Sequence, residues 1–133
     1  MSSFTEPLTV TKIGSRRWKV ERAFRYYVGS ENSNVFIEVP QGTTTDFASV
    51  PQPFWILFPP DGKYTQAAVV HDLLYGCGGE VLRFYPQYEN LSKEEMRKLC
   101  DDIFLEAMTV LEVPKWVRKT MYHAVRMFGR FVF

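Results

Sequence analysis

The chain has 133 residues, a length typical of one domain, and its 46% hydrophobic and 16% aromatic content is that of a globular rather than a disordered protein. Its 16 basic and 15 acidic residues give a net charge of +1, which argues against a general nucleic-acid binder. It has no apolar leader and no run near the roughly 20 apolar residues that a membrane-spanning helix needs, so we expect a soluble protein without a transmembrane segment.

The first forty residues have the pattern of short strands. Alternating or β-branched side chains predict strands over residues 9–13, 18–28 and 35–39, and the polar segments 14–15 and 29–34 read as turns. Consecutive strands with short connections favour a small antiparallel β-meander, between about residues 8 and 40, with one face in water.

A proline-rich segment follows the predicted strands, over residues 40–63. Five of the eight prolines lie there, namely Pro40, Pro51, Pro53, Pro59 and Pro60. Because proline fixes its own φ and restricts the residue before it, we predict a rigid loop. Rigid loops often hold functional side chains.

Three helices are predicted in the second half, over residues 64–75, 92–111 and 114–129. The second begins with a capping box, in which Ser92 is the N-cap and Glu95 the third helical residue. Pro114 suits the first turn of the third helix. The sequence therefore predicts one α+β domain over residues 1–133, in which a small N-terminal antiparallel β-meander packs against about three C-terminal helices.

Two short polar motifs lie beside the most apolar part of the chain: TDFASVP at residues 45–51, and His71-Asp72 after the apolar run at residues 67–70. The helical period places His71 on the same side of its helix as Leu74, and we expect it to be half-buried. On the next helix, Asp101 lies at the edge of the apolar stripe and Asp102 points away. The candidate catalytic residues are Asp46, Ser49, His71, Asp72 and Asp101.

Several chemistries remain open for these residues. His71 would be the general acid/base, with Asp72 or Asp101 to orient it. A Ser-His-Asp arrangement would use Ser49, although no Gly-x-Ser-x-Gly motif surrounds it. Each residue also fits a structural role, as a helix cap, a turn residue or a hydrogen-bonded core group.

The cofactor stays unknown at this point, with a divalent metal as one candidate. Magnesium or calcium would suit carboxylates from Asp46, Asp72 and Asp101. Zinc is disfavoured because His123 lies off the apolar stripe of its helix, which leaves His71 as a lone histidine ligand.

Two segments are candidate contact surfaces. The first is the aromatic cluster Phe54, Trp55, Phe58 and Tyr64, which could anchor a partner. The second is the C-terminus, where residues 113–133 carry five cations and no acid and could lie on an anionic membrane. We favour the alternative for the C-terminus, in which Phe131 and Phe133 pack on the sheet.

The motifs TDFASVP, FW at residues 54–55 and AAVVHDLLY at residues 67–75 resemble a family of unknown function found in tailed phages and bacterial prophages. The resemblance continues through DDIFLEAM at residues 101–108 and MYHAVRMFG at residues 121–129, in the same order. It implies a small phage-encoded protein, made in the host cytoplasm, with the virion as a second location. The loop at residues 78–90 looks longer than is usual in this family.

The resemblance brings no established activity. If the protein is an enzyme, we expect a hydrolase, and the resemblance to phage proteins implies an envelope or cell-wall polymer as its substrate. The alternative is a non-enzymatic virion component, such as a tail or baseplate accessory or assembly protein, that binds other phage structural proteins and uses the same polar residues structurally.

Overall fold

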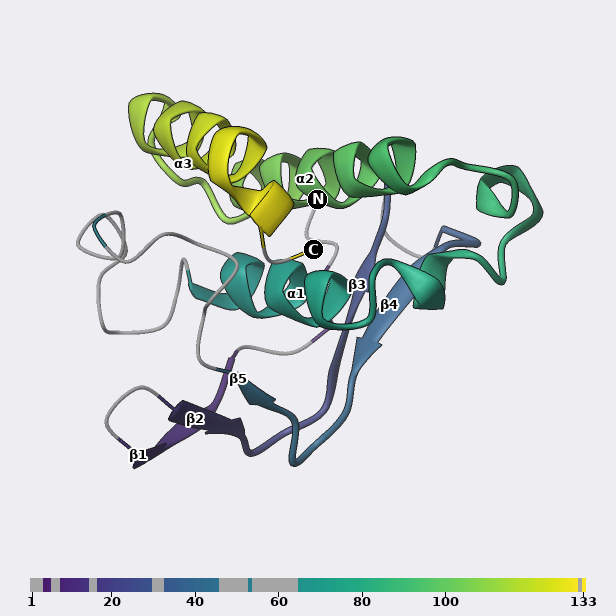
Figure 1. The fold of residues 1–133 in the computed structure, drawn as a ribbon. Coiled ribbons are helices and arrows are strands. Elements are labelled where there is room, and N and C mark those ends of the chain that lie inside the picture. Colours follow the sequence, from purple (N-terminus) through teal and green to yellow (C-terminus); the bar gives the residue numbers. More distant parts are fainter. Residues whose placement is uncertain are drawn as a thin grey trace.

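The computed structural model describes residues 4–5, 8–14, 17–29, 33–45, 53, 65–131 and 133. The three helices lie above one small antiparallel sheet, and a second, two-stranded antiparallel sheet stands beside them (Figure 1), so the predicted α+β class is confirmed. The strands are β1 (Val10–Gly14), β2 (Arg17–Val20), β3 (Phe24–Tyr27), β4 (Phe36–Val39) and β5 (Thr44–Thr45). The helices are α1 (Thr65–Gly76), α2 (Lys93–Val110) and α3 (Lys115–Phe128), with short 3-10 turns η2 (Glu80–Leu82), η3 (Pro86–Tyr88) and η4 (Gly129–Phe131).

The strands form two sheets rather than the single meander that the sequence predicted. One sheet has the order β1-β2-β5, and the other pairs β3 with β4. The predicted strand over residues 18–28 is broken after Val20, where the amide of Val20 donates to Thr43 O and that of Glu21 donates to Thr9 O. Val20, Phe24 and Tyr26 are all buried on one parity, so the alternating pattern runs through the break without revealing it.

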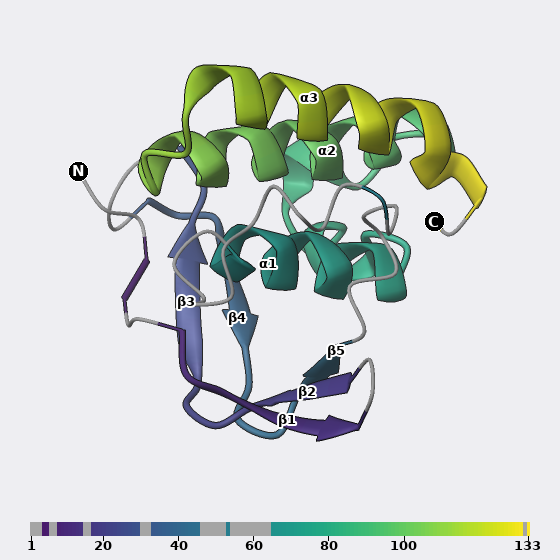
Figure 2. The same cartoon turned by 90° about the vertical axis from the view of Figure 1, so that its left-hand side faces the viewer.

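Helix α1 forms the middle layer, between the β1-β2-β5 sheet and the other two helices, and the β3-β4 sheet flanks it (Figures 1 and 2). Eight of its 12 residues are buried, on nearly all sides. A helix that is apolar all round belongs in a core, and α1 packs against α2 on one side and against β4 and β5 on another. No described helix is both long and apolar enough to cross a membrane.

Helix α2 begins as predicted, at a complete capping box. The hydroxyl of Ser92 accepts a hydrogen bond from the amide of Glu95 (3.1 Å), and the Glu95 carboxylate accepts one from the amide of Ser92 (2.9 Å). Pro114 is the N-cap of α3 rather than its first helical residue. Between the two helices Glu112 adopts a φ of 61°, which reverses the chain and lets α3 pack back along α2.

The connection from α1 to α2 is built on close contacts. Gly79 has a φ of 77°, and a Cβ there would lie 2.3 Å from Met96 Cγ, so only glycine fits. Further along, the Tyr85 hydroxyl donates to Phe36 O and accepts from the amide of Phe36, both at 3.1 Å, on strand β4.

The C-terminal residues differ from our expectation. Phe131 is 72% exposed, and Phe133 packs edge-on against Tyr75 of α1, with ring centroids 4.9 Å apart. The prediction that both rings pack on the sheet is therefore wrong. The Phe133 side chain thus meets helix α1, and the Phe131 side chain faces solvent.

Candidate functional site

Helices α1 and α2 lie side by side and bring His71 into contact with Asp101. His71 Nε2 lies 2.7 Å from Asp101 Oδ1, and neither side chain has any exposed surface. The inward orientation predicted for Asp101 is confirmed. His71 is more deeply buried than the half-buried position expected for it, because α2 and Phe104 cover its ring.

The Asp101 carboxylate is surrounded by hydrogen-bond donors from all three helices. Its Oδ1 accepts from His71 and from the Tyr75 hydroxyl (2.6 Å) on α1. Its Oδ2 accepts from Arg126 Nη1 (2.8 Å) on α3, and Arg97 Nη1 of α2 lies 3.6 Å away. Tyr75 follows His71 by one helical turn, and Arg97 precedes Asp101 by one turn, so helical geometry places each pair on one face.

These contacts determine the protonation of the buried centre. Burial alone would raise the pKa of Asp101, but hydrogen bonds from His71, Tyr75 and Arg126 outweigh burial and lower this pKa below its ordinary value of 3.8. Burial and the Asp101 charge raise the pKa of Tyr75. Asp101 is therefore ionised and Tyr75 a neutral donor at pH 7. The 2.7 Å contact fits a hydrogen bond that His71 Nε2–H donates to the ionised Asp101 carboxylate.

Aromatic rings fix the plane of the imidazole. The ring of Phe104 stacks on His71 with centroids 4.5 Å apart and an interplanar angle of 27°. The ring of Tyr75 lies 4.2 Å from the same imidazole. Stacking of this kind restricts rotation of the His71 ring, so the direction of the bond to Asp101 is held from two sides.

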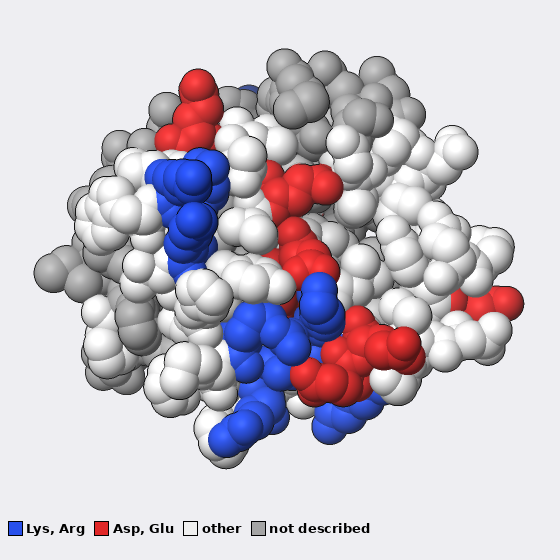
Figure 3. Space-filling model, turned by 90° about the horizontal axis from the view of Figure 1, so that it is seen from above, with Lys and Arg blue, Asp and Glu red and all other residues white. Residues whose placement is uncertain are grey.

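A second group of charges holds the arginines in place. The Glu94 carboxylate accepts hydrogen bonds from Nε and Nη2 of Arg97, at 3.1 and 2.8 Å, and from Nη2 of Arg126, at 3.1 Å. Arg97 Nη1 also donates to Val125 O, at 3.3 Å. Seen from above, basic and acidic side chains adjoin one another on this side of the molecule (Figure 3). The arginines around Asp101 are thus positioned by further hydrogen bonds and are not isolated charges.

Asp72 lies next to His71 in the chain but makes a different contact. Its Oδ2 accepts a hydrogen bond from the hydroxyl of Thr45 on β5. It also borders a hollow of about 220 Å³ between α1 and the strands, with Thr43, Thr44, Thr45, Val69, Leu73, Gly76 and Cys77 as the other lining residues. Of the two carboxylates considered as partners for His71, it is therefore Asp101 that orients the ring. The Thr45–Asp72 hydrogen bond joins the two sequence motifs.

The remaining predicted site residues lie outside the part of the chain that the structure describes. Asp46 and Ser49 lie outside the described residues, as do the four aromatic residues Phe54, Trp55, Phe58 and Tyr64. Tyr75, Arg97 and Arg126 also belong to the centre and were not among the predicted site residues. The spacing of four residues from His71 to Tyr75 and from Arg97 to Asp101 was a usable signal for the first two.

The geometry does not suit Asp101 as a metal ligand. Both of its oxygens are engaged by donors, and two guanidinium groups lie beside it, which repel a cation. Among the described residues, no group of three His, Cys, Asp or Glu side chains is arranged to hold a metal. The set of Asp46, Asp72 and Asp101 considered above as a metal site is therefore not assembled around Asp101.

The lowered pKa of Asp101 predicts an acid-sensitive contribution to stability. The ionised form is favoured in the folded state, so this contribution is complete above pH 3.8 and is lost as pH falls through the lower folded pKa. We expect urea unfolding free energies to fall over this range in the wild type, and less steeply in Asp101→Asn. Equal slopes would contradict the assignment. Should the variant not fold, ¹³C NMR of the Asp101 carboxyl in the wild type gives the pKa directly.

Comparison with known proteins places the chain among uncharacterised relatives. A family model described as "Protein of unknown function (DUF1353)" matches residues 18–125. The "Uncharacterized protein y4jT" of Sinorhizobium fredii (strain NBRC 101917 / NGR234) is 34% identical over 93 residues, which are 68% of this chain and 23% of that protein. The chain thus spans about a quarter of the length of this relative. No solved structure matches the chain.

Proposed function

The chain belongs to the DUF1353 family of proteins of unknown function, and we propose that it is a hydrolase in which His71 is the general acid/base and Asp101 orients it. The observation that supports this is the 2.7 Å contact between His71 Nε2 and Asp101 Oδ1 in a fully buried position. A buried carboxylate on one imidazole nitrogen is the arrangement that makes the other nitrogen an effective base.

The chemistry follows from the charges at the centre. Ionised Asp101 holds the Nε2 proton of His71 and stabilises the imidazolium that forms when Nδ1 accepts a proton. Tyr75 and Arg126 keep the carboxylate from turning away. His71 would take the proton from a water or from a protein hydroxyl as it attacks the substrate, and would return it to the leaving group.

Asp46 and Ser49 belong to this proposal through their place in the chain. They follow Thr45 by one and four residues, and Thr45 bonds to Asp72, the neighbour of His71. In the proposal Ser49 is the candidate nucleophile and Asp46 a second carboxylate. Water activated directly by His71 is the alternative nucleophile.

The origin and substrate are further parts of the proposal, and they rest on the resemblance of the motifs to phage and prophage proteins. A phage-encoded hydrolase made in the host cytoplasm has the bacterial envelope or cell wall as its natural target. We therefore propose a polymer of that kind as the substrate class.

A second candidate is supported by the way Asp101 links the helices. His71 and Tyr75 belong to α1, Asp101 and Arg97 to α2, and Arg126 to α3, so one carboxylate ties three helices together. A structural ion cluster has this form as well. In that case the protein is a non-enzymatic virion component, such as a tail or baseplate accessory or assembly protein.

Activity measurements with two histidine variants test the proposal. We expect the purified protein to hydrolyse a member of a panel of chromogenic esters or labelled cell-wall preparations. The variant His71→Asn should lose about 10²–10⁴-fold in turnover, the usual contribution of general acid–base catalysis. The matched control is His123→Asn, at the exposed histidine of α3, which should keep wild-type turnover.

Two results would contradict the hydrolase. One is a folded His71→Asn variant, verified by circular dichroism, that turns over as fast as the wild type. The other is no hydrolysis of any substrate together with the protein at stoichiometric copy number in purified phage particles. The second result would establish the virion component instead.

A further inference from the structure

Large apolar side chains stand exposed along one side of α3 and η4. Trp116 is 65% exposed, Met127 62% and Phe131 72%. With 3.6 residues per turn, positions 116 and 127 lie within about 20° of each other around the helix axis, and Phe131 follows in η4. Trp116 and Met127 therefore share one side of α3, about three turns apart, and with Phe131 beyond the end of the helix they make a discontinuous apolar strip.

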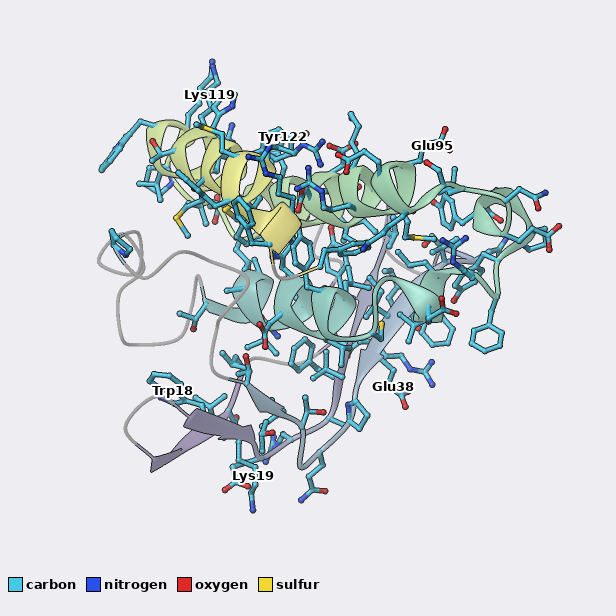
Figure 4. All side chains as sticks on the ribbon, viewed as in Figure 1. Trp18, Lys19, Glu38, Glu95, Lys119 and Tyr122 are labelled. Atoms are coloured by element: carbon cyan, nitrogen blue, oxygen red, sulfur yellow. The ribbon has the colours of Figure 1, made fainter. Side chains whose placement is uncertain are left out.

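Basic side chains run beside this strip. Lys115, Lys119 and Arg130 are exposed, and among the described residues none of the three makes an ion pair. Lys119 points away from the rest of the molecule (Figure 4), and the Arg130 guanidinium lies over the Phe131 ring, 4.9 Å from its centroid. No Asp or Glu occurs in residues 113–133. The α3 surface, as we call it, consists of Lys115, Trp116, Lys119, Met127, Arg130 and Phe131.

The rest of the helix is already occupied. Val117, Met121, Ala124 and Val125 are buried in the core, and Arg126 is bound to Asp101 and Glu94. Folding thus uses the apolar face of α3 and both of its arginines, since Arg118 Nη1 also donates to Val113 O (2.9 Å), and it leaves the α3 surface uncovered. Since α3 is the outermost helix (Figure 2), its long side is accessible to a flat surface.

We propose that the α3 surface docks on an anionic lipid bilayer. Exposed Trp and Phe side chains beside Lys and Arg are the composition of helices that lie in the membrane interface. The aromatic side chains enter the acyl boundary while the long basic side chains reach the headgroups. Protein–protein interfaces share the Trp, Phe, Met and Arg of this surface but are depleted in lysine, whereas the α3 surface pairs two exposed lysines with a segment that has no acid. The net charge of +1 gives no general attraction to nucleic acid. The surface therefore fits an anionic bilayer better than either of those partners.

Vesicle co-sedimentation of the full chain tests this inference. We expect binding to phosphatidylcholine vesicles that contain phosphatidylglycerol, weakened by added salt, and little binding to phosphatidylcholine alone. Lys119→Gln should weaken binding about fivefold, the effect of one basic residue near an anionic membrane. Trp116→Ser should weaken binding about tenfold or more, because the variant lacks the apolar area that the indole buries in the bilayer.

Matched controls come from elsewhere on the surface. Phe84→Ser removes the most exposed large hydrophobic side chain of the described residues, at 86%, and Lys93→Gln removes an exposed lysine of α2. Both variants should bind vesicles as the wild type does. Equal binding to neutral and anionic vesicles, or equal losses in the control variants, would overturn the proposal. Vesicle binding by Trp116→Ser at the wild-type level would also overturn it. So would a wild-type protein that binds no vesicles but self-associates or binds an oligonucleotide, if the α3 variants lose that binding.

This proposal is independent of the hydrolase. It uses side chains on the outer side of α3, and none of them contacts the His71–Asp101 pair. A protein that binds vesicles, but whose folded His71→Asn variant turns over as fast as the wild type, would support docking and contradict the proposed hydrolase. A hydrolase that needs His71 but binds no vesicles would do the opposite.

Discussion

Replacing Asp101 with asparagine is expected to lower the free energy of unfolding by about 3–5 kcal/mol, the usual cost of breaking a buried ion pair by removing one partner. The amide would face Arg126 Nη1 at 2.8 Å and the nearby Arg97 without a negative charge. It would also present an N–H group to donors such as the Tyr75 hydroxyl, which now shares Oδ1 with His71. Chemical denaturation at pH 7 measures the loss.

The next residue offers a matched control. Asp102 is half-exposed and accepts from Lys98 (2.8 Å) and from the Tyr122 hydroxyl (2.6 Å). Because solvent screens this pair, Asp102→Asn should cost no more than about 1 kcal/mol. Equal losses in the two variants would show that the buried network contributes no more than a surface pair, and would contradict the central role given to Asp101.

Truncating Phe104 to alanine is the second change with a large expected effect. The ring has no exposed surface and stacks on His71. Removing it takes away buried apolar area and leaves a cavity beneath the imidazole, at an expected cost of about 3–5 kcal/mol. The same cavity would free the His71 ring to turn, so we also expect broadened His71 ring signals in NMR spectra.

The variant Phe104→Leu separates volume from stacking. Leucine fills most of the space of the ring, so this change should cost about 1.5 kcal/mol or less and leave the imidazole fixed. A loss in Phe104→Leu as large as in Phe104→Ala would mean that the aromatic stack itself, rather than the filled volume, stabilises this part of the core.

The helices were largely predictable from the sequence, and so was one half of the buried pair. The capping box at Ser92 and the 3.6-residue apolar period predicted α2. The same period predicted that Asp101 faces the core, where it is buried. These are local signals, in which the residues that decide the outcome lie within a few turns of each other. The inward orientation of Asp101 followed from its own helix alone.

The rest depends on contacts between segments far apart in the chain. Arg126 reaches Asp101 only because α3 packs along α2, an arrangement that no local pattern encodes. Likewise the alternation across residues 18–28 is the same for one long strand as for β2 and β3 in separate sheets. The strand divides because β5, at Thr44–Thr45, pairs with β2, and two threonines after a turn are a weak strand signal.

The hydrogen bonds between the Tyr85 hydroxyl and strand β4 bear on the solubility of the protein. A two-stranded sheet has open edges, and an open edge exposes amide and carbonyl groups that can pair with a strand of another molecule. Tyr85 occupies one such donor and acceptor of Phe36 on β4. The segment between α1 and α2 thus shields this edge and disfavours aggregation by strand addition, so its length has a use that is separate from any chemistry at His71.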